Sequence, residues 1–132
     1  MGPDLRLLLD THALLWALTD SPKLSKKARQ ALAGAELEHF VSAATAMEIF
    51  TKHRLGRLPE AAELVKHWNR VMAPPGYTPL AITMAHAARA GALPHPHGDP
   101  FDRILIAQAL SEGLTMISNE KLFDSFGVER IW

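Results

Sequence analysis

The residues Leu5-Arg6-Leu7-Leu8-Leu9-Asp10 form a short apolar run that ends in a carboxylate. An apolar run of this length is typical of a strand buried on both faces of a parallel sheet. Further strand-like segments follow at 39–42, 77–83, 114–118 and 128–132, and helical patterns separate them. This alternation predicts an α/β fold, in which helices cover both faces of a mostly parallel sheet of four or five strands.

The segments between these strands are expected to be helical. The first expected helix follows the first strand and ends at about Thr19. The others span residues 26–33, 45–55, 62–73, 85–93, 100–112 and 121–126. Thr11 and Ser25 are expected to cap the first two, and Pro74-Pro75-Gly76 to end the helix over 62–73. The helix from Pro100 is apolar on most sides, so we expect it to be the most deeply buried.

Length and composition limit the class of protein. The 132 residues suit one domain, spanning residues 1–132. Lys and Arg (14) balance Asp and Glu (14), so no overall basic field attracts nucleic acid. The absence of cysteine excludes disulfides, thiolate metal ligands and thiol catalysis. No stretch approaches the roughly 20 apolar residues of a spanning helix, so we expect a soluble, cytoplasmic protein with no membrane contact.

Acidic residues occupy positions at which a charge is costly. Asp10 ends the first strand, Glu48 is the only charge between Val41 and Thr51, and Glu120 follows the fourth strand. Asp99 and Asp102 flank the start of the most apolar helix. The carboxyl ends of parallel strands meet at one edge of a sheet, where ligands bind. We therefore expect all these acids to converge there.

Such a cluster is unfavourable without a counter-ion. Two carboxylates about 5 Å apart repel by roughly 3 kcal/mol at an effective dielectric constant of about 20. Mg²⁺ or Mn²⁺, which prefer carboxylate oxygens and water, would relieve this repulsion. An ion of this kind activates water and stabilises charge on a phosphoryl oxygen. The pattern thus favours metal-assisted hydrolysis of a phosphodiester.

Each acid also has a structural role open to it. Asp99, directly before Pro100, is a candidate helix N-cap, and Asp102 a candidate partner of the helix dipole. For the remaining acids the structural roles are a surface pair of Glu48 with Lys52, a cap of the first helix by Asp10, and a first-turn position of Glu120 after an Asn119 cap. The functional interpretation depends on the shared location of the acids.

Basic residues lie close to two of the acids. They are Lys52, His53, Arg54 and Arg57 after Glu48, and Arg103 after Asp102. A solvated helix face is one interpretation. The other is a set of RNA-phosphate contacts beside the metal, which we expect of Lys52, Arg54, Arg57 and Arg103. His12 is either a substrate contact or simply a residue at the start of a helix.

Several stretches resemble the PIN-domain family, and within it the VapC-type toxins of bacterial toxin–antitoxin pairs. They are Leu8-Leu9-Asp10-Thr11-His12, Ala46-Met47-Glu48-Ile49, the segment 97–109 and Met116-Ile117-Ser118-Asn119-Glu120. The resemblance covers essentially the whole chain. Its most specific part is Asp99-Pro100-Phe101-Asp102-Arg103.

The resemblance implies a PIN-like three-layer α/β/α sandwich and a Mg²⁺-dependent endoribonuclease, with Mn²⁺ as a substitute. Asp10, Glu48 and Asp102 match the family's acidic metal-site positions, and Glu120 matches a fourth catalytic acid that is most often Asp. Additional matches are Ser118, at the usual Thr or Ser, Asp99, and Thr11 of the Asp-Thr pair. The resemblance also implies an RNA substrate, a homodimer and a cognate antitoxin. His12 departs from the more frequent Asn.

Two other classes of function compete with the nuclease. A non-catalytic PIN-like module would act only through dimer or partner binding. A phosphotransfer enzyme would use Asp10 as its nucleophile. The haloacid-dehalogenase pattern, however, requires an acid two residues after the nucleophile, and that position is occupied by His12. A receiver domain would need paired acids at the first strand and a late lysine.

Overall fold

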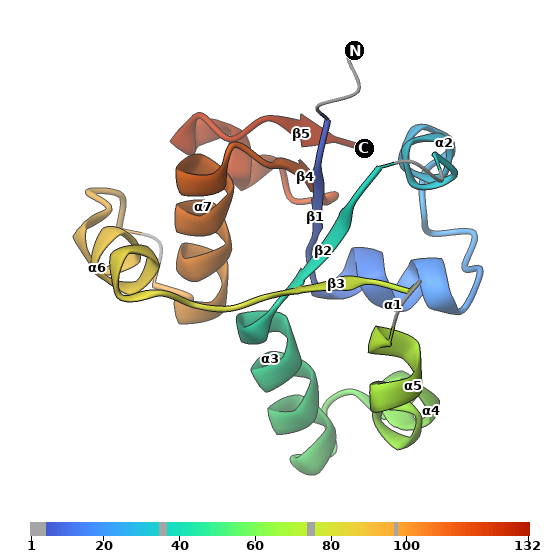
Figure 1. Cartoon of the computed structure of the whole chain (residues 1–132). Coiled ribbons are helices and arrows are strands. Elements are labelled where there is room, and N and C mark those ends of the chain that lie inside the picture. Colours follow the sequence, from blue (N-terminus) through green and yellow to red (C-terminus); the bar gives the residue numbers. More distant parts are fainter. Residues whose placement is uncertain (1–4, 35–36, 74–75, 97) are drawn as a thin grey trace.

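The computed structural model describes residues 5–34, 37–73, 76–96 and 98–132 (Figure 1). Its strands are β1 (Leu7–Leu9), β2 (His39–Ser42), β3 (Thr78–Leu80), β4 (Thr115–Ile117) and β5 (Arg130–Ile131). They form a five-stranded sheet in the order β3-β2-β1-β4-β5, and every neighbouring pair is parallel. The predicted α/β class and parallel sheet are confirmed.

Helices connect the strands. They are α1 (Thr11–Leu18), α2 (Lys26–Leu32), α3 (Ala43–Arg54), α4 (Ala62–Lys66), α5 (Trp68–Met72), α6 (Met84–Ala92) and α7 (Pro100–Glu112), with 3-10 helices η1 (Pro59–Ala61) and η2 (Lys121–Phe126). Ser25 caps α2 as expected, through its hydroxyl and the Ala28 amide. None of the described helices is long and apolar enough to cross a membrane.

One expected helix is wrong. The segment 62–73 contains two short helices, because His67, with φ −113° and ψ 21°, leaves the helical conformation between α4 and α5. Trp68 packs against the core beyond this break. Pro74 and Pro75, expected to end the helix, and His97 of the family-like segment lie outside the described residues.

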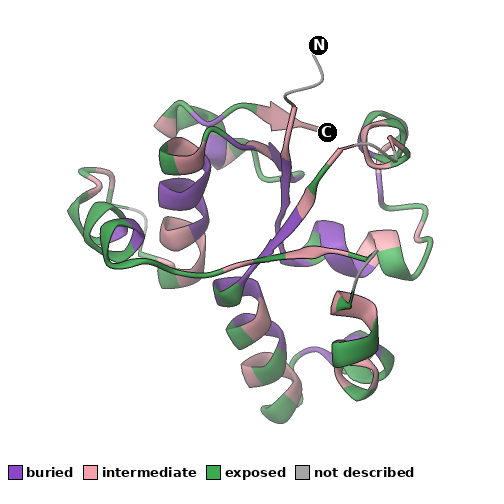
Figure 2. Cartoon of the chain, in the orientation of Figure 1, coloured by how far each residue is buried: buried purple, intermediate pink, exposed green. Residues whose placement is uncertain are grey.

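The two faces of the sheet carry separate apolar cores. Leu7 and Leu9 point to one face and pack with α1, α2 and α4, whereas Leu8 points to the other face and packs with α7 and η2. All three leucines are fully buried, as the purple β1 in Figure 2 shows. The consecutive leucines of β1 therefore contribute to both apolar cores of a three-layer sandwich.

The strand order determines where a ligand can bind. The chain runs from the central β1 outward through β2 to β3, and later resumes on the other side of β1 with β4. The crevice beyond the carboxyl ends of β1 and β4 is therefore the topological switch point of the sheet, where ligands of open α/β folds bind. Asp10 follows β1, and Ser118 follows β4.

Candidate functional site

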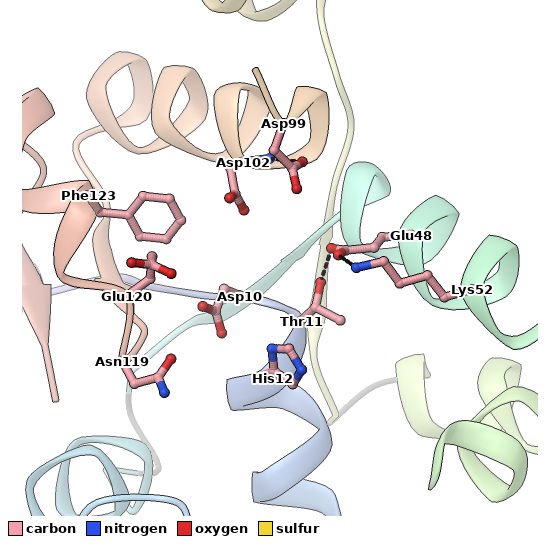
Figure 3. A pocket seen from close by; sticks show the side chains of 10 residues that line it. All are labelled: Asp10, Thr11, His12, Glu48, Lys52, Asp99, Asp102, Asn119, Glu120 and Phe123. Atoms are coloured by element: carbon pink, nitrogen blue, oxygen red, sulfur yellow. Dashed lines mark hydrogen bonds and ion pairs between the residues drawn. The ribbon is translucent and has the colours of Figure 1, made fainter. Parts of the chain in front are cut away.

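A cavity of about 160 Å³ lies beyond this edge of the sheet. It is lined by Asp10, Thr11, His12, Glu48, Lys52, Asp99, Asp102, Asn119, Glu120 and Phe123 (Figure 3). All the acids expected to converge line this one cavity. They come from the ends of β1 and β4 and from helices α3 and α7. The sheet topology thus assembles side chains that are far apart in the sequence.

Asp10 joins the sheet to the first helix. Its Oδ1 accepts a hydrogen bond from the Ala13 amide at 2.8 Å, so Asp10 is the N-cap of α1. Thr11, expected to be this cap, is instead the first residue of the helix. Asp10 has the extended backbone and short acceptor side chain that an N-cap needs. Because Asp10 is the single residue between the end of β1 and the start of α1, its capping carboxylate lies at the edge of the sheet where the cavity is.

Burial makes the Asp10 carboxyl unusually hard to ionise. The pKa of Asp10 is raised from 3.8 to about 6, mainly by burial and to a smaller extent by the nearby Asp102. Hydrogen bonds from Ser118 and the Ala13 amide, and the charge of His12, lower the pKa but do not cancel the burial. A buried carboxyl near a second acid is stabilised in its charged form by a cation.

Glu48 is buried, with both carboxylate oxygens occupied. The Thr11 hydroxyl donates to Oε1 at 2.5 Å, and the Lys52 ammonium lies 2.5 Å from Oε2. The pair with Lys52 exists, but it is no surface pair, because only 9% of the Glu48 side chain is exposed. These contacts fix Glu48 at the wall of the cavity (Figure 3).

The two aspartates of α7 have different tasks. Asp99 is the N-cap, and its Oδ1 accepts from the amides of Phe101 (2.9 Å) and Asp102 (3.1 Å). The structural role open to Asp99 is therefore confirmed. Asp102 is half-buried in the first turn, and its carboxylate projects into the cavity toward Asp10 (Figure 3). Of the two, Asp102 is better placed to contact a ligand in the cavity (Figure 3), because Asp99 Oδ1 is engaged by backbone amides.

The end of β4 supplies the remaining polar wall. Ser118 is fully buried, and its hydroxyl accepts from the Glu120 amide at 2.9 Å. Glu120 is exposed at the rim and caps η2 through the Leu122 amide at 3.4 Å. Glu120 rather than Asn119 is therefore the cap. Glu120 is therefore the acid of this cavity wall whose side chain is exposed to solvent.

The fold and the cavity agree with a known family. The PIN domain family model matches residues 7–129 of the chain. The chain belongs to the PIN domain family. The resemblance inferred from the sequence is therefore confirmed.

This PIN domain is 31% identical over 116 residues to Ribonuclease VapC22 of Mycobacterium tuberculosis, and the aligned region is 87% of each protein. Its fold resembles the crystal structure of VapBC2 from Rickettsia felis bound to a DNA fragment from their promoter, with TM-score 0.69, 12% identity and coverage of 97% of this chain and 100% of that chain. DNA-bound VapBC from Salmonella typhimurium has TM-score 0.65, 20% identity and coverage of 96% of both chains.

The basic residues of this PIN domain divide into two groups. Lys52 lines the cavity, and Arg54 and Arg57 are exposed at and beyond the end of α3. The Arg103 guanidinium instead donates to the carbonyls of Ala90 (2.9 Å), His95 (2.8 Å) and Leu93 (2.7 Å), and so ties the end of α6 to α7. These bonds give Arg103 a structural task, although we expected it to contact phosphate.

Sequence reasoning missed several parts of this site. Phe123 forms an apolar wall from η2, and no local pattern distinguishes it from an ordinary core residue. Asn119 lies on the rim within the family-like strand-end segment, which was its only signal. The Thr11–Glu48 bond joins residues 37 apart in the sequence, so only the assembled sheet reveals it.

The donor set fits a hard divalent cation bound mainly through two carboxylates. Asp10 and Asp102 present carboxylate oxygens of the kind that such an ion binds, and their mutual repulsion is what a cation would relieve. Within the described part of the chain, no group of three or more His, Asp or Glu side chains is close enough to hold an ion by itself. Mg²⁺ commonly binds one or two carboxylates, keeps several waters and takes further oxygens from substrate phosphates.

Proposed function

We propose that this PIN domain is a metal-dependent endoribonuclease that hydrolyses RNA phosphodiester bonds, and that it is the toxin of a toxin–antitoxin pair. One observation carries the proposal: a family member similar to a VapC ribonuclease collects its buried acids in one cavity at the switch point of the sheet. The buried Asp10 beside Asp102 gives that cavity the chemistry of a cation site.

Asp10 and Asp102 are the proposed ligands of Mg²⁺, for which Mn²⁺ substitutes. When bound, the ion supplies Lewis-acid stabilisation of a phosphoryl oxygen and lowers the pKa of water. Asp10 is held in place by its cap bond to Ala13 and by Ser118. Asp102 is held by the rigid first turn of α7, which Asp99 caps. Both carboxylates are therefore positioned before substrate arrives.

Glu48 is the third catalytic acid that the family resemblance indicated, and the contacts here favour a positioning role. Its oxygens accept from Thr11 and Lys52, so a direct bond to the ion would require one of these contacts to break. Glu48 then orients the Lys52 ammonium toward the phosphate. Glu120, exposed at the rim, can accept a proton or hold an outer water, and Asp99 remains a cap.

RNA would run from the cavity along α3. Lys52, Arg54 and Arg57 provide positive charge along this path, beginning at the cavity wall. Local phosphate contacts of this kind compensate for a net charge of zero. Arg103 is left out of the path because its donors hold α6.

An exposed apolar face supports a protein partner. Met47, Phe50 and Leu55 of the α3 region are 65%, 41% and 50% exposed, and the Phe50 ring meets Trp68 of α5 edge-on at 5.4 Å. Exposed aromatic and Met side chains are typical of interfaces. We assign this face to the cognate antitoxin or to a second copy in a homodimer, with the protein acting in the cytoplasm.

The test is cleavage of RNA by the purified protein with Mg²⁺ or Mn²⁺. Asp10→Asn and Asp102→Asn should each abolish cleavage, while circular dichroism shows an unchanged fold. Asp124→Asn is the matched control, since Asp124 pairs with Arg130 outside the cavity. Equal cleavage by wild type and both site variants would contradict the proposal. Lack of cleavage of any RNA by the wild type would favour the non-catalytic module.

A further inference from the structure

A row of aromatic rings begins at the rim of the cavity. His12 and Trp16, one turn apart on α1, have ring centroids 5.3 Å apart with planes tilted by 32°. Trp16 in turn lies 5.7 Å from Trp132 at the end of the chain. The Lys23 ammonium lies 5.9 Å from the centre of the Trp16 ring. The catalytic proposal uses none of these residues.

The ends of this row differ in exposure. Trp16 and Trp132 are half-buried and pack against the core on the α1 side of the sheet. His12 is exposed, lines the cavity and is close enough to Asp10 to influence its charge. Figure 3 shows the His12 ring at the start of α1, beside Asp10. The exposed ring is therefore supported from behind by an indole that the core holds.

We infer that His12, supported by Trp16, is the platform on which an unpaired nucleobase next to the scissile phosphate stacks. The inference rests on the proposed ribonuclease function and assigns it a base-contacting residue. A flat ring held rigidly beside a cation site is the arrangement with which proteins bind single-stranded nucleic acid. Lys23 adds positive charge behind the platform. In a duplex the faces of a base are covered by its neighbours, so only an unpaired base can stack on the His12 ring.

A structural explanation of the row makes a different prediction. If His12 only covers Trp16, its removal lowers stability and leaves base recognition unchanged. If the His12 ring is a platform, another flat ring replaces it. The comparison of His12→Ala with His12→Phe therefore separates stacking from a hydrogen bond or charge of the imidazole.

The experiment measures binding of two probes to proteins that also carry Asp102→Asn, so that RNA is not consumed. One probe is a short unstructured oligoribonucleotide, and the other is an abasic ribose-phosphate oligomer of the same length. We expect His12→Ala to weaken binding of the first probe about tenfold, the effect of one lost stacking contact. His12→Phe should restore most of the affinity. The abasic oligomer should bind equally to the Asp102→Asn protein and to the two His12 variants made in it.

Two controls complete the design. His67→Ala removes a partly exposed histidine beside Trp68, outside the cavity, and should leave binding unchanged. Tryptophan fluorescence should be quenched by the oligoribonucleotide, and Trp16→Phe, but not Trp68→Phe, should remove most of the quenching.

Specific outcomes overturn the inference. They are an absence of binding, an equal loss of affinity for both probes in His12→Ala, or no rescue by His12→Phe. Cleavage by proteins with Asp102 intact is assayed in parallel. RNA cutting that does not depend on the His12 ring would contradict the platform and leave the proposed ribonuclease standing, whereas a protein that binds but never cuts would contradict the ribonuclease.

Discussion

The Lys52 ammonium lies 2.5 Å from Glu48 Oε2, one helical turn away on α3 and at the wall of the acidic cavity. A cation of the protein itself therefore neutralises one of the buried acids. A buried carboxylate needs a charged or hydrogen-bonded partner, and Lys52 is that partner for Glu48. This pairing also means that Lys52 influences both the affinity for a metal ion and the affinity for RNA.

We predict that Lys52→Gln changes these two affinities in opposite directions. Loss of a positive charge beside the cavity should tighten Mn²⁺ binding about fivefold, which corresponds to roughly 1 kcal/mol of Coulomb energy. Loss of a phosphate contact should weaken RNA binding. Calorimetry with Mn²⁺ and anisotropy with labelled RNA measure the two effects. Lys66→Gln, an exposed change on α4, is the control, and a variant that loses both affinities would contradict the prediction.

We predict that Asp10→Asn stabilises the metal-free protein at neutral pH. The folded pKa of about 6 lies above the unfolded value of 3.8, so the folded state loses stability as pH rises through this range. At pH above 6 the ionised carboxyl costs up to about 3 kcal/mol, and Asn removes the charge while keeping the cap. Urea unfolding should show a gain at neutral pH that disappears below pH 3.8.

Mg²⁺ provides the control for this prediction. It should raise the stability of the wild type and have little effect on Asp10→Asn, because only the ionised carboxylate binds the ion. If the variant and the wild type have the same stability at neutral pH, the burial of Asp10 has no energetic consequence and the prediction is wrong.

Thr11→Val tests the other contact of Glu48. Valine has nearly the shape of threonine but cannot donate to Oε1, so we expect a loss of about 1–3 kcal/mol in the free energy of unfolding. Cleavage should fall because Glu48 and Lys52 lose their fixed orientation, whereas RNA affinity should change little. Thr11→Ser retains the hydroxyl and should keep most of both properties. If Thr11→Ser is as damaged as Thr11→Val, the lost hydrogen bond is not the cause.

The sequence could predict what depends on local patterns and strand order. The apolar run before Asp10 indicated a buried parallel strand, and Pro100 indicated the start of α7 with Asp99 as its cap. The positions of the acids at strand ends and helix starts indicated that they meet at one edge of the sheet. These features follow from hydrophobic period, capping chemistry and the rule for ligand sites in parallel sheets.

Partners from distant parts of the chain could not be predicted. The role of Glu48 depends on Thr11, and the role of Arg103 depends on carbonyls in the last turn of α6 and just after it; these partners approach only in the folded chain. The break at His67 arises in a segment whose apolar spacing suits one continuous helix. Local pattern therefore located the acids, whereas tertiary contacts decide which of them can bind an ion.

The contrast between Arg103 and the arginines near the end of α3 gives a last prediction. Arg103 donates to carbonyls in the last turn of α6 and just after it, so Arg103→Lys should destabilise the protein by about 2 kcal/mol, because one ammonium cannot satisfy several acceptors in a fork geometry. Arg54→Gln and Arg57→Gln should leave stability within about 0.5 kcal/mol of the wild type, as exposed changes do.

RNA binding should depend on Arg54 and Arg57 and not on Arg103. Each of Arg54→Gln and Arg57→Gln should weaken affinity for RNA of any sequence and lower the slope of log affinity against log salt by about 0.7, the value for one phosphate contact on a single strand. Arg103→Gln, which removes the charge as the other two variants do, should leave this slope unchanged at a temperature where the variant is folded. A reduced slope in Arg103→Gln alone would restore Arg103 to the RNA path and remove Arg54 and Arg57 from it.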